Sequence, residues 1–320
     1  MPPPERSPSR RPLDALALAR VLRRLNAASE PPWLHGEVAR RMAERLAVIK
    51  LQPAAVADWH AFTGASREYL RRAYPAATVV AVEPDAARRD ATAAALKEPW
   101  WSPARWRGGV ARVLTPPQLA AGEVQLMWSN MAPHLAEDPQ ALFAAWHRAL
   151  AVDGFLMFST LGPGTLGSLR GLYASEGWGE PFAPFVDMHD LGDMLIEAGF
   201  ADPVMDQETI TLTWTDADRA LAELRSLGGN MARGRAPGLR TPRWRARLLD
   251  ALSAQARRTP GGRLALDFEI VYGHAFRPLP RPRVAAETAL PLDDLRAMVR
   301  SGRRAASPGP QGSGGPDTLG

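Results

Sequence analysis

The sequence predicts an α/β protein with a Rossmann-like sheet of five parallel strands plus an antiparallel pair, and with helices on both faces. Over residues 56–160, buried apolar runs alternate with helical patterns, which is typical of a parallel sheet covered on both sides. Residues 209–214 and 264–272 instead alternate apolar and polar residues, as half-exposed antiparallel strands do. Between these two segments lies an arginine-rich helical insertion, residues 216–258.

The first strand–loop–helix–strand unit, residues 56–84, is where a ligand site is expected. Its first strand reaches Asp58, its loop ends at Gly64, a helix begins near Ala65, and its second strand ends at Glu83. Such a unit is half of a nucleotide-binding fold. The carboxylate of Glu83 can accept hydrogen bonds from both ribose hydroxyls of an adenosine, and a glycine permits close backbone approach.

The loop lacks most of the glycines that bound nucleotides require. A dinucleotide site needs G-x-G-x-x-G, so nicotinamide binding is not expected. The pattern D-x-G-x-G-x-G brings backbone close to S-adenosylmethionine. Here Asp58 and Gly64 match it, while His60 and Phe62 occupy the first two glycine positions. Side chains at these positions would crowd that cofactor.

Polar residues also follow later strands of the sheet. The fourth strand, near residues 124–129, ends at Asn130, and the fifth, residues 155–160, ends at Thr160; a short third strand is expected within residues 106–114. Ligands of parallel sheets gather at the carboxyl ends of strands. The candidate cofactor-binding residues are therefore Asp58, His60, Gly64, Glu83 and Asn130. His134 is a candidate substrate-binding residue, because it could orient a carboxylate.

Composition limits the alternatives. The 320 residues, 46% of them hydrophobic, can form one large core, and the absence of cysteine excludes disulfides and thiolate chemistry. No apolar run approaches about 18 residues, and the basic, proline-rich start is no signal peptide, so we expect a soluble, cytoplasmic monomer. No metal site is expected. We expect tails at residues 1–28 and 278–320, mostly disordered, around a domain at residues 29–277.

The positive charge is concentrated in one segment. The chain has a net charge of +5, and only Lys50 and Lys97 are lysines. Residues 219–258 contain ten arginines against two acids, Glu223 and Asp250, a local charge of +8. Such a surface would attract an anionic partner. The base composition of the genome would also favour arginine over lysine, so the bias alone does not establish docking.

Four stretches carry a resemblance to a known family. They are SNMAPHLAEDPQALFAAWHRALAVDGFLMFSTLGPGTLGSLR (129–170), FVDMHDLGDMLIEAGFADPVMDQETITLTW (185–214), LRSLGGN (224–230) and FEIVYGHAF (268–276). The chain resembles the malonyl-acyl-carrier-protein O-methyltransferases of biotin synthesis over about residues 33–277. The run FSTLGPGTL followed by VDMHDLGD is the most specific part of this resemblance.

The resemblance implies a class I methyltransferase fold and S-adenosylmethionine as cofactor. The implied reaction transfers a methyl group to the free carboxylate of a malonyl thioester on acyl carrier protein. A carboxylate is already a nucleophile, so alignment and exclusion of water would suffice without a catalytic base. Acyl carrier protein, an acidic partner, would dock on the arginine-rich insertion.

The chain departs from the family pattern where the cofactor would bind. Besides His60 and Phe62, the third strand lacks the expected acid, and His134 stands where the family often has glutamine. One alternative is therefore a non-catalytic, methyltransferase-like protein that binds an acidic partner. A nucleic-acid methyltransferase is disfavoured, because the basic segment shows no base-amine motif and no interleaved aromatic residues.

Overall fold

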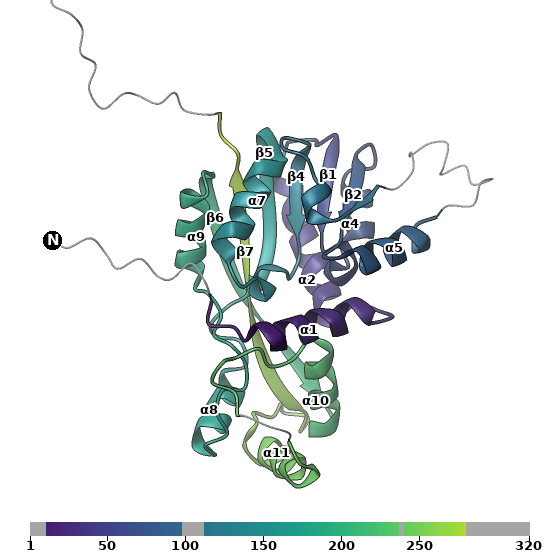
Figure 1. The fold of residues 1–320 in the computed structure, drawn as a ribbon. Coiled ribbons are helices and arrows are strands. Elements are labelled where there is room, and N and C mark those ends of the chain that lie inside the picture. The colour runs from purple at the N-terminus through teal and green to yellow at the C-terminus, as the bar shows by residue number, and fades with distance from the viewer. Residues whose placement is uncertain (1–10, 98–111, 237–239, 280–320) are drawn as a thin grey trace, which may run out of the picture. The chain divides into compact units, whose positions relative to one another are not determined.

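Seven strands form one sheet in the order β3-β2-β1-β4-β5-β7-β6 (Figure 1). This computed structural model describes residues 11–97, 112–236 and 240–279. Neighbouring strands from β3 to β5 are parallel, whereas β7 runs antiparallel to β5 and to β6. The predicted fold is thereby confirmed. The strands are β1 (Ala55–Trp59), β2 (Thr78–Val82), β3 (Val113–Leu114), β4 (Val124–Ser129), β5 (Leu150–Leu161), β6 (Ala201–Trp214) and β7 (Leu264–Phe276).

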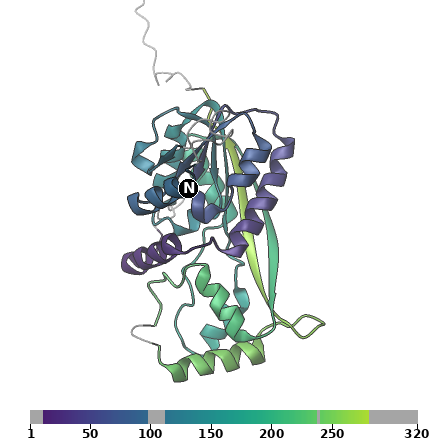
Figure 2. The ribbon, with the colours of Figure 1, turned by 90° about the vertical axis from the view of Figure 1, so that its right-hand side faces the viewer.

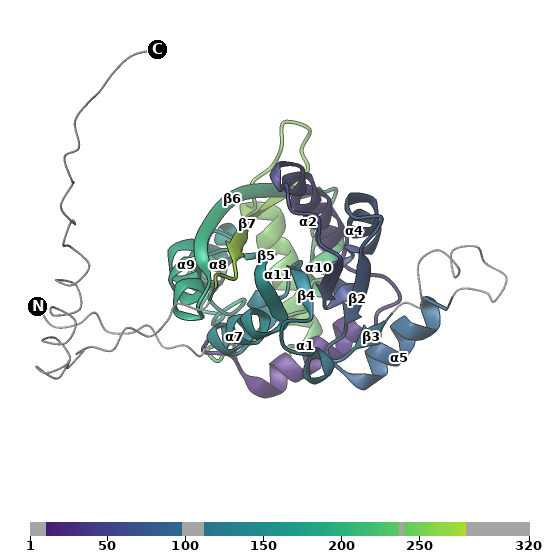
Figure 3. The same cartoon turned by 90° about the horizontal axis from the view of Figure 1, so that it is seen from above.

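Helices cover both faces of the sheet, with α2 and α4 on one side and α7 and α9 on the other (Figure 3). Side chains cap two of these helices: Asp138 accepts a hydrogen bond from the Ala141 N–H at the start of α7, and Asp187 accepts one from the His189 N–H at the start of α9. These helices are α2 (Trp33–Glu44), α4 (Arg67–Ala73), α5 (Ala86–Ala95), α7 (Pro139–Ala149) and α9 (Met188–Glu197).

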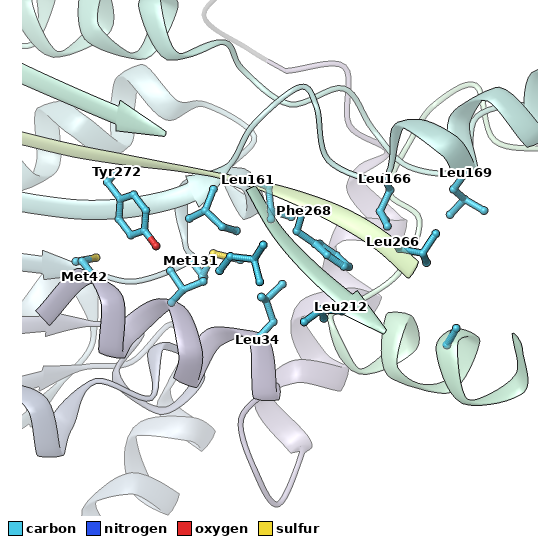
Figure 4. Close-up of a cluster of buried hydrophobic side chains, with 14 of the residues drawn as sticks. Leu34, Met42, Met131, Leu161, Leu166, Leu169, Leu212, Leu266, Phe268 and Tyr272 are labelled. Carbon is cyan, nitrogen blue, oxygen red and sulfur yellow. The ribbon is translucent and has the colours of Figure 1, made fainter. Parts of the chain in front are cut away.

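The apolar side chains form a core on each face. On the α2 side, Met42, Met131 and Tyr272 lie in one continuous cluster that extends along β7 to Phe268 (Figure 4). On the opposite face, residues of α7 and α9 pack against the sheet. The predicted alternation of β6 is confirmed, because Ile210 and its apolar neighbours two residues apart are buried while the intervening threonines are not.

The helical insertion lies beyond the carboxyl ends of the parallel strands, as Figure 1 shows. It consists of α10 (Ala217–Ser226) and α11 (Pro242–Gln255), and α8 (Gly167–Ser175), which follows β5, packs against α11. Leu248 and Leu252 of α11 are buried in the same core cluster as the sheet residues. The insertion is therefore attached to the sheet by apolar packing.

The segment predicted as an N-terminal tail contains an ordered helix, so that prediction is wrong for the residues described here. Helix α1 (Ala15–Ala27) crosses between the sheet and the insertion (Figure 2). Asp14 caps it by accepting a hydrogen bond from the Ala17 N–H. Leu13, Val21 and Leu25 are buried with residues of the insertion. The packed part of the domain therefore includes α1 and begins before residue 29.

One other boundary differs from that predicted. The loop before the expected helix at Ala65 itself forms one helical turn, α3 (Ala61–Gly64), and the next helix, α4, begins at Arg67. Val113 and Leu114 form β3 within the segment predicted for the third strand, and residues 106–111 of that segment lie outside the described chain. All but the first two residues of the predicted C-terminal tail also lie outside it. No helix among the described residues is long and apolar enough to cross a membrane.

The contact between β5 and β7 yields a stability prediction. Gly273 lies opposite Phe158, and the Phe158 ring fills the space that a Cβ on residue 273 would need. We expect Gly273→Ala to lower the free energy of unfolding by about 2 kcal/mol or more, because a buried ring must move. Urea denaturation followed by circular dichroism measures this change.

The matched control is Gly171→Ala in the middle of α8, where an added Cβ meets no atom within 4 Å. This substitution should raise the free energy of unfolding by up to about 1 kcal/mol, because alanine has the higher helix propensity. Equal effects of the two substitutions would contradict the assigned packing of Phe158.

Candidate active site

The turn at the carboxyl end of β1 has an unusual backbone. His60 (φ 56°) and Ala65 (φ 54°), which flank α3, both adopt the left-handed conformation. This conformation costs non-glycine residues on the order of 1 kcal/mol, so glycine is normally favoured. His60 occupies the first glycine position of the methyltransferase pattern. The side chain has changed there, but the backbone keeps a conformation that suits glycine.

Glu83, directly after β2, holds this turn in place through a hydrogen bond. It is 1% exposed, and its Oε1 accepts hydrogen bonds from the Phe62 N–H (3.0 Å) and from the Thr92 hydroxyl (2.8 Å). Burial raises the pKa of the Glu83 carboxyl above its ordinary value. The Arg88 guanidinium covers the Phe62 ring, 3.6 Å from its centroid. One of the two Glu83 oxygens, which were expected to bind a ribose, is therefore already bonded to the protein.

Asp58 presents a buried carboxylate without hydrogen bonds. It is 1% exposed, and neither oxygen accepts a hydrogen bond from any residue that the structure describes. Burial, with a smaller contribution from the charge of Glu83, raises the pKa of Asp58 to about 8, while the charge of Arg67 acts in the opposite direction. The Asp58 carboxyl therefore makes no hydrogen bond to the amides of the loop. An unpaired buried acceptor fits a ligand that brings a positive charge, as S-adenosylmethionine does.

Asn130 holds the turn in place through its side-chain amide. Its Nδ2 donates to the carbonyl oxygens of His35 (2.8 Å) and Gly64 (2.6 Å), and its Oδ1 accepts from the Ser159 hydroxyl (2.6 Å). These bonds connect α2, the turn, β4 and β5. The structure therefore assigns the amide a positioning role, and a contact between Asn130 and the cofactor stays a prediction.

Packing within the protein does not explain the glycine at position 64, whereas the His60 ring has a packing partner. An added Cβ on Gly64 would lie 3.6 Å from Asn130 Cβ and O, an ordinary contact, so protein packing does not require glycine there. The His60 ring stacks on Trp59, with centroids 6.0 Å apart, and burial lowers its pKa to about 4. His60 is absent from the residues that line the large cavity described below.

His35 is a site residue that the sequence analysis missed. Its ring lies in the interior, 1% exposed, and burial lowers its pKa to about 4, so it is neutral. Its Nδ1 lies 2.7 Å from the Thr63 carbonyl oxygen, and therefore carries the proton that it donates to the turn. Nothing in the spacing of the α2 sequence marks this histidine, because its helix was expected only to cover the sheet.

His134 lies between His35 and the aromatic residue Phe185. Its ring centroid is 6.5 Å from that of His35 and 6.2 Å from that of Phe185, both edge-on. Its pKa lies well below the ordinary value because of burial, with further contributions from the charges of His35 and Arg11. Its Nδ1 has no hydrogen-bond partner among the described residues. A neutral imidazole with an unused nitrogen can bind a ligand.

A cavity of about 400 Å³ extends from His134 into the space between the sheet and the insertion. Figure 4 shows four of its apolar lining residues, contributed by β5, α8 and β7: Leu161, Leu166, Leu169 and Phe268. The other lining side chains are mostly apolar or aromatic, and this volume is typical of small-molecule sites. The sequence analysis did not predict that the insertion would close a cavity.

Exposed charged residues mark the outer side of this cavity. Arg225 of α10, Arg240 and Arg245 line it and are exposed, together with Asp218. The Arg245 guanidinium forms an ion pair with Asp218. The cavity therefore has an uncharged apolar interior and a net positive rim.

The chain is similar to curated proteins over most of its length. It is 40% identical over 254 residues to the malonyl-acyl-carrier-protein O-methyltransferase of Gallionella capsiferriformans, covering 78% of this chain and 85% of that protein. It is 38% identical over 276 residues to the enzyme of the same name from Laribacter hongkongensis, covering 83% and 88%. Residues 61–158 match the family model described as a methyltransferase domain.

Among solved structures, a Bacillus halodurans protein described as a candidate methyltransferase superposes with a TM-score of 0.50. The superposition covers 76% of this chain and all of that one, at 13% identity. At this identity the similarity establishes the fold alone, and it agrees with the strand order of the sheet.

The buried carboxyl of Asp58 makes a prediction about pH. Between pH values of about 4 and about 8 the folded protein retains a proton on Asp58 that the unfolded chain has lost, so this group makes stability fall as pH rises. Asp58→Asn removes the effect. Relative to wild type, the variant should therefore be more stable at about pH 9 than at about pH 5, which means a larger difference in the free energy of unfolding in its favour.

Thermal and urea unfolding of both proteins at the two pH values provide the measurement. A relative stability that is the same at both pH values, or lower at the alkaline one, would show that the buried carboxyl does not carry this proton.

Proposed function

The chain belongs to the malonyl-acyl-carrier-protein O-methyltransferase family, and on this premise we propose that it methylates the free carboxylate of a malonyl thioester on acyl carrier protein, a step of biotin synthesis. S-adenosylmethionine is the methyl donor, and the product is a methyl ester. The single observation that carries the proposal is the position of the cavity. An apolar chamber begins at His134, beside the turn that follows β1, and ends at an arginine-rich rim.

Residues at the ends of β1 and β2 would hold the cofactor. Bound there, S-adenosylmethionine supplies a methyl group that is activated by a positively charged sulfur. The buried Asp58 carboxyl would give up its proton and offer a negative charge to a cationic ligand, and Gly64 stands at the last glycine position of the family pattern. Glu83, at the end of β2, is the candidate for the ribose hydroxyls. These three assignments, together with His60 and Asn130, remain predictions.

The cavity would position the other reactant. A carboxylate is ionised at neutral pH, so the reaction requires no general base. His134 would orient the carboxylate through its unused nitrogen, while the apolar walls exclude water that would solvate the nucleophile. Alignment of the reacting oxygen with the transferred carbon then provides most of the acceleration.

The rim would receive the carrier protein. Arg225 and Arg240 are exposed at the cavity, and no described acid lies within ion-pair distance of either side chain. Positive charge around an opening accelerates encounter with an acidic partner and orients it. The thioester arm of the carrier could then reach the cavity while the carrier itself remains outside.

The experiment that tests this function combines cofactor binding with turnover. The purified chain should bind S-adenosylmethionine in calorimetry and convert malonyl-acyl carrier protein to its methyl ester, detected by mass spectrometry. Asp58→Asn should weaken cofactor binding at least about tenfold, because an amide cannot ionise to pair with the cationic cofactor, without lowering protein stability.

Asp90→Asn, on the exposed surface of α5, is the matched control and should bind the cofactor as wild type does. Absence of cofactor binding by the wild-type chain would refute the enzymatic function and favour the non-catalytic alternative.

A second experiment addresses the rim. The double substitution of Arg225 and Arg240 by glutamate should reduce kcat/KM at least about tenfold for malonyl-acyl carrier protein, and should leave a small malonyl thioester nearly unaffected. Arg219→Glu, in the same insertion but outside the cavity lining, is the control. Equal losses with both substrates would show that these arginines act on the cavity and not on the carrier.

A further inference from the structure

Arg11 is a buried arginine from the segment before α1. It is 6% exposed, and its guanidinium donates hydrogen bonds to the carbonyl oxygens of His134 and Pro184, the latter at 2.6 Å. The guanidinium also lies 6.0 Å from the centroid of the Phe185 ring. The backbone N–H of Arg11 donates to the Glu137 carbonyl (2.8 Å). The arginine thus connects the start of the domain to the loops after β4 and before α9.

The charge of Arg11 has no acidic counterpart among the residues that the structure describes. Both of its acceptors are neutral carbonyls, and its Nε has no hydrogen-bond partner. Burial lowers the pKa of Arg11 to about 10, so it stays charged at neutral pH. By contrast, the nearby Arg235 forms an ion pair with Asp14 at 2.7 Å. An unpaired buried cation is costly, which is a reason to expect an anionic ligand beside it.

The position of Arg11 places its charge beside the cavity. The residues that it contacts, His134 and Phe185, line the cavity, and so does Ala183, next to the Pro184 carbonyl that it binds. The guanidinium therefore lies behind the wall at the His134 end. Coulomb interactions are stronger in an apolar, water-poor chamber than in water. The field of this charge would reach an anion bound at His134.

We propose that Arg11 determines specificity: its charge makes the His134 end of the cavity select an ionised carboxylate over a neutral group of the same shape. This inference rests on the proposed function and extends it to a residue outside the family resemblance. It also accounts for release of product. The methyl ester is neutral, so it loses the attraction that holds the carboxylate substrate, and the site binds substrate in preference to product.

The test compares a carboxylate with its neutral isostere. Malonyl-N-acetylcysteamine thioester and its terminal amide are titrated into the full chain by calorimetry, and kcat/KM is measured for the carboxylate. The wild type should prefer the carboxylate. Arg11→Gln should lose at least about tenfold of this preference without weakening the amide, because only the charge is removed. Arg11→Lys should retain most of the preference.

Arg24→Gln is the matched control. Like Arg11, Arg24 donates a hydrogen bond to a backbone carbonyl, here that of Gly228, but its side chain lies in α1 and is exposed. It should leave the preference unchanged. If Arg11→Gln and Arg11→Lys both weakened binding of the carboxylate and of the amide equally, Arg11 would only hold the N-terminal segment in place. That result would overturn the inference. Should Arg11→Gln not fold, a wild type that binds carboxylate and amide equally would overturn it as well.

The outcomes separate the two proposals. A wild type that methylates no malonyl thioester refutes the proposed function, whatever the binding preference. A wild type that methylates the thioester, but whose preference survives Arg11→Gln, refutes only the role of Arg11.

Discussion

A buried acid, the protonated Asp58, and a buried cation, Arg11, lie at the carboxyl end of this sheet, and the function of the site depends on them. Asp58 has no hydrogen-bond donor, and Arg11 has no acid, among the residues described. Each is energetically unfavourable in the folded protein alone. The cost is compensated if a cationic cofactor binds at one charge and an anionic substrate at the other. Binding sites commonly sacrifice stability in this way.

The surrounding scaffold keeps these groups in place. Asn130 ties α2 to the turn after β1, and Glu83 holds the same turn through the Phe62 amide and Thr92. His35 adds a third bond to the turn. These interactions compensate for left-handed residues that are not glycine, so the turn keeps its shape although the sequence pattern is degenerate. A family position can therefore change its residue while the backbone conformation is retained.

The spacing of apolar residues was sufficient to predict the sheet. Buried parallel strands are continuous apolar runs, whereas the half-exposed antiparallel pair alternates apolar and polar residues, as Ile210 and its flanking threonines do. The site was only partly predictable. Asp58 lies near the end of a strand and Glu83 directly follows one, so both could be found, whereas Asn130 donates to backbone carbonyls that carry no residue signal. Arg11 lies in a proline- and arginine-rich stretch that is typical of a tail, and only tertiary contacts with two distant segments show its role.

The central claim is that a buried, protonated carboxyl becomes the anion that holds a cationic cofactor. Calorimetric titration of the wild-type chain with S-adenosylmethionine, in buffers of different ionisation enthalpy below about pH 8, tests it most directly, because binding must then ionise Asp58. The account predicts release of close to one proton for each cofactor bound. Binding without proton release, or no binding at all, would contradict it.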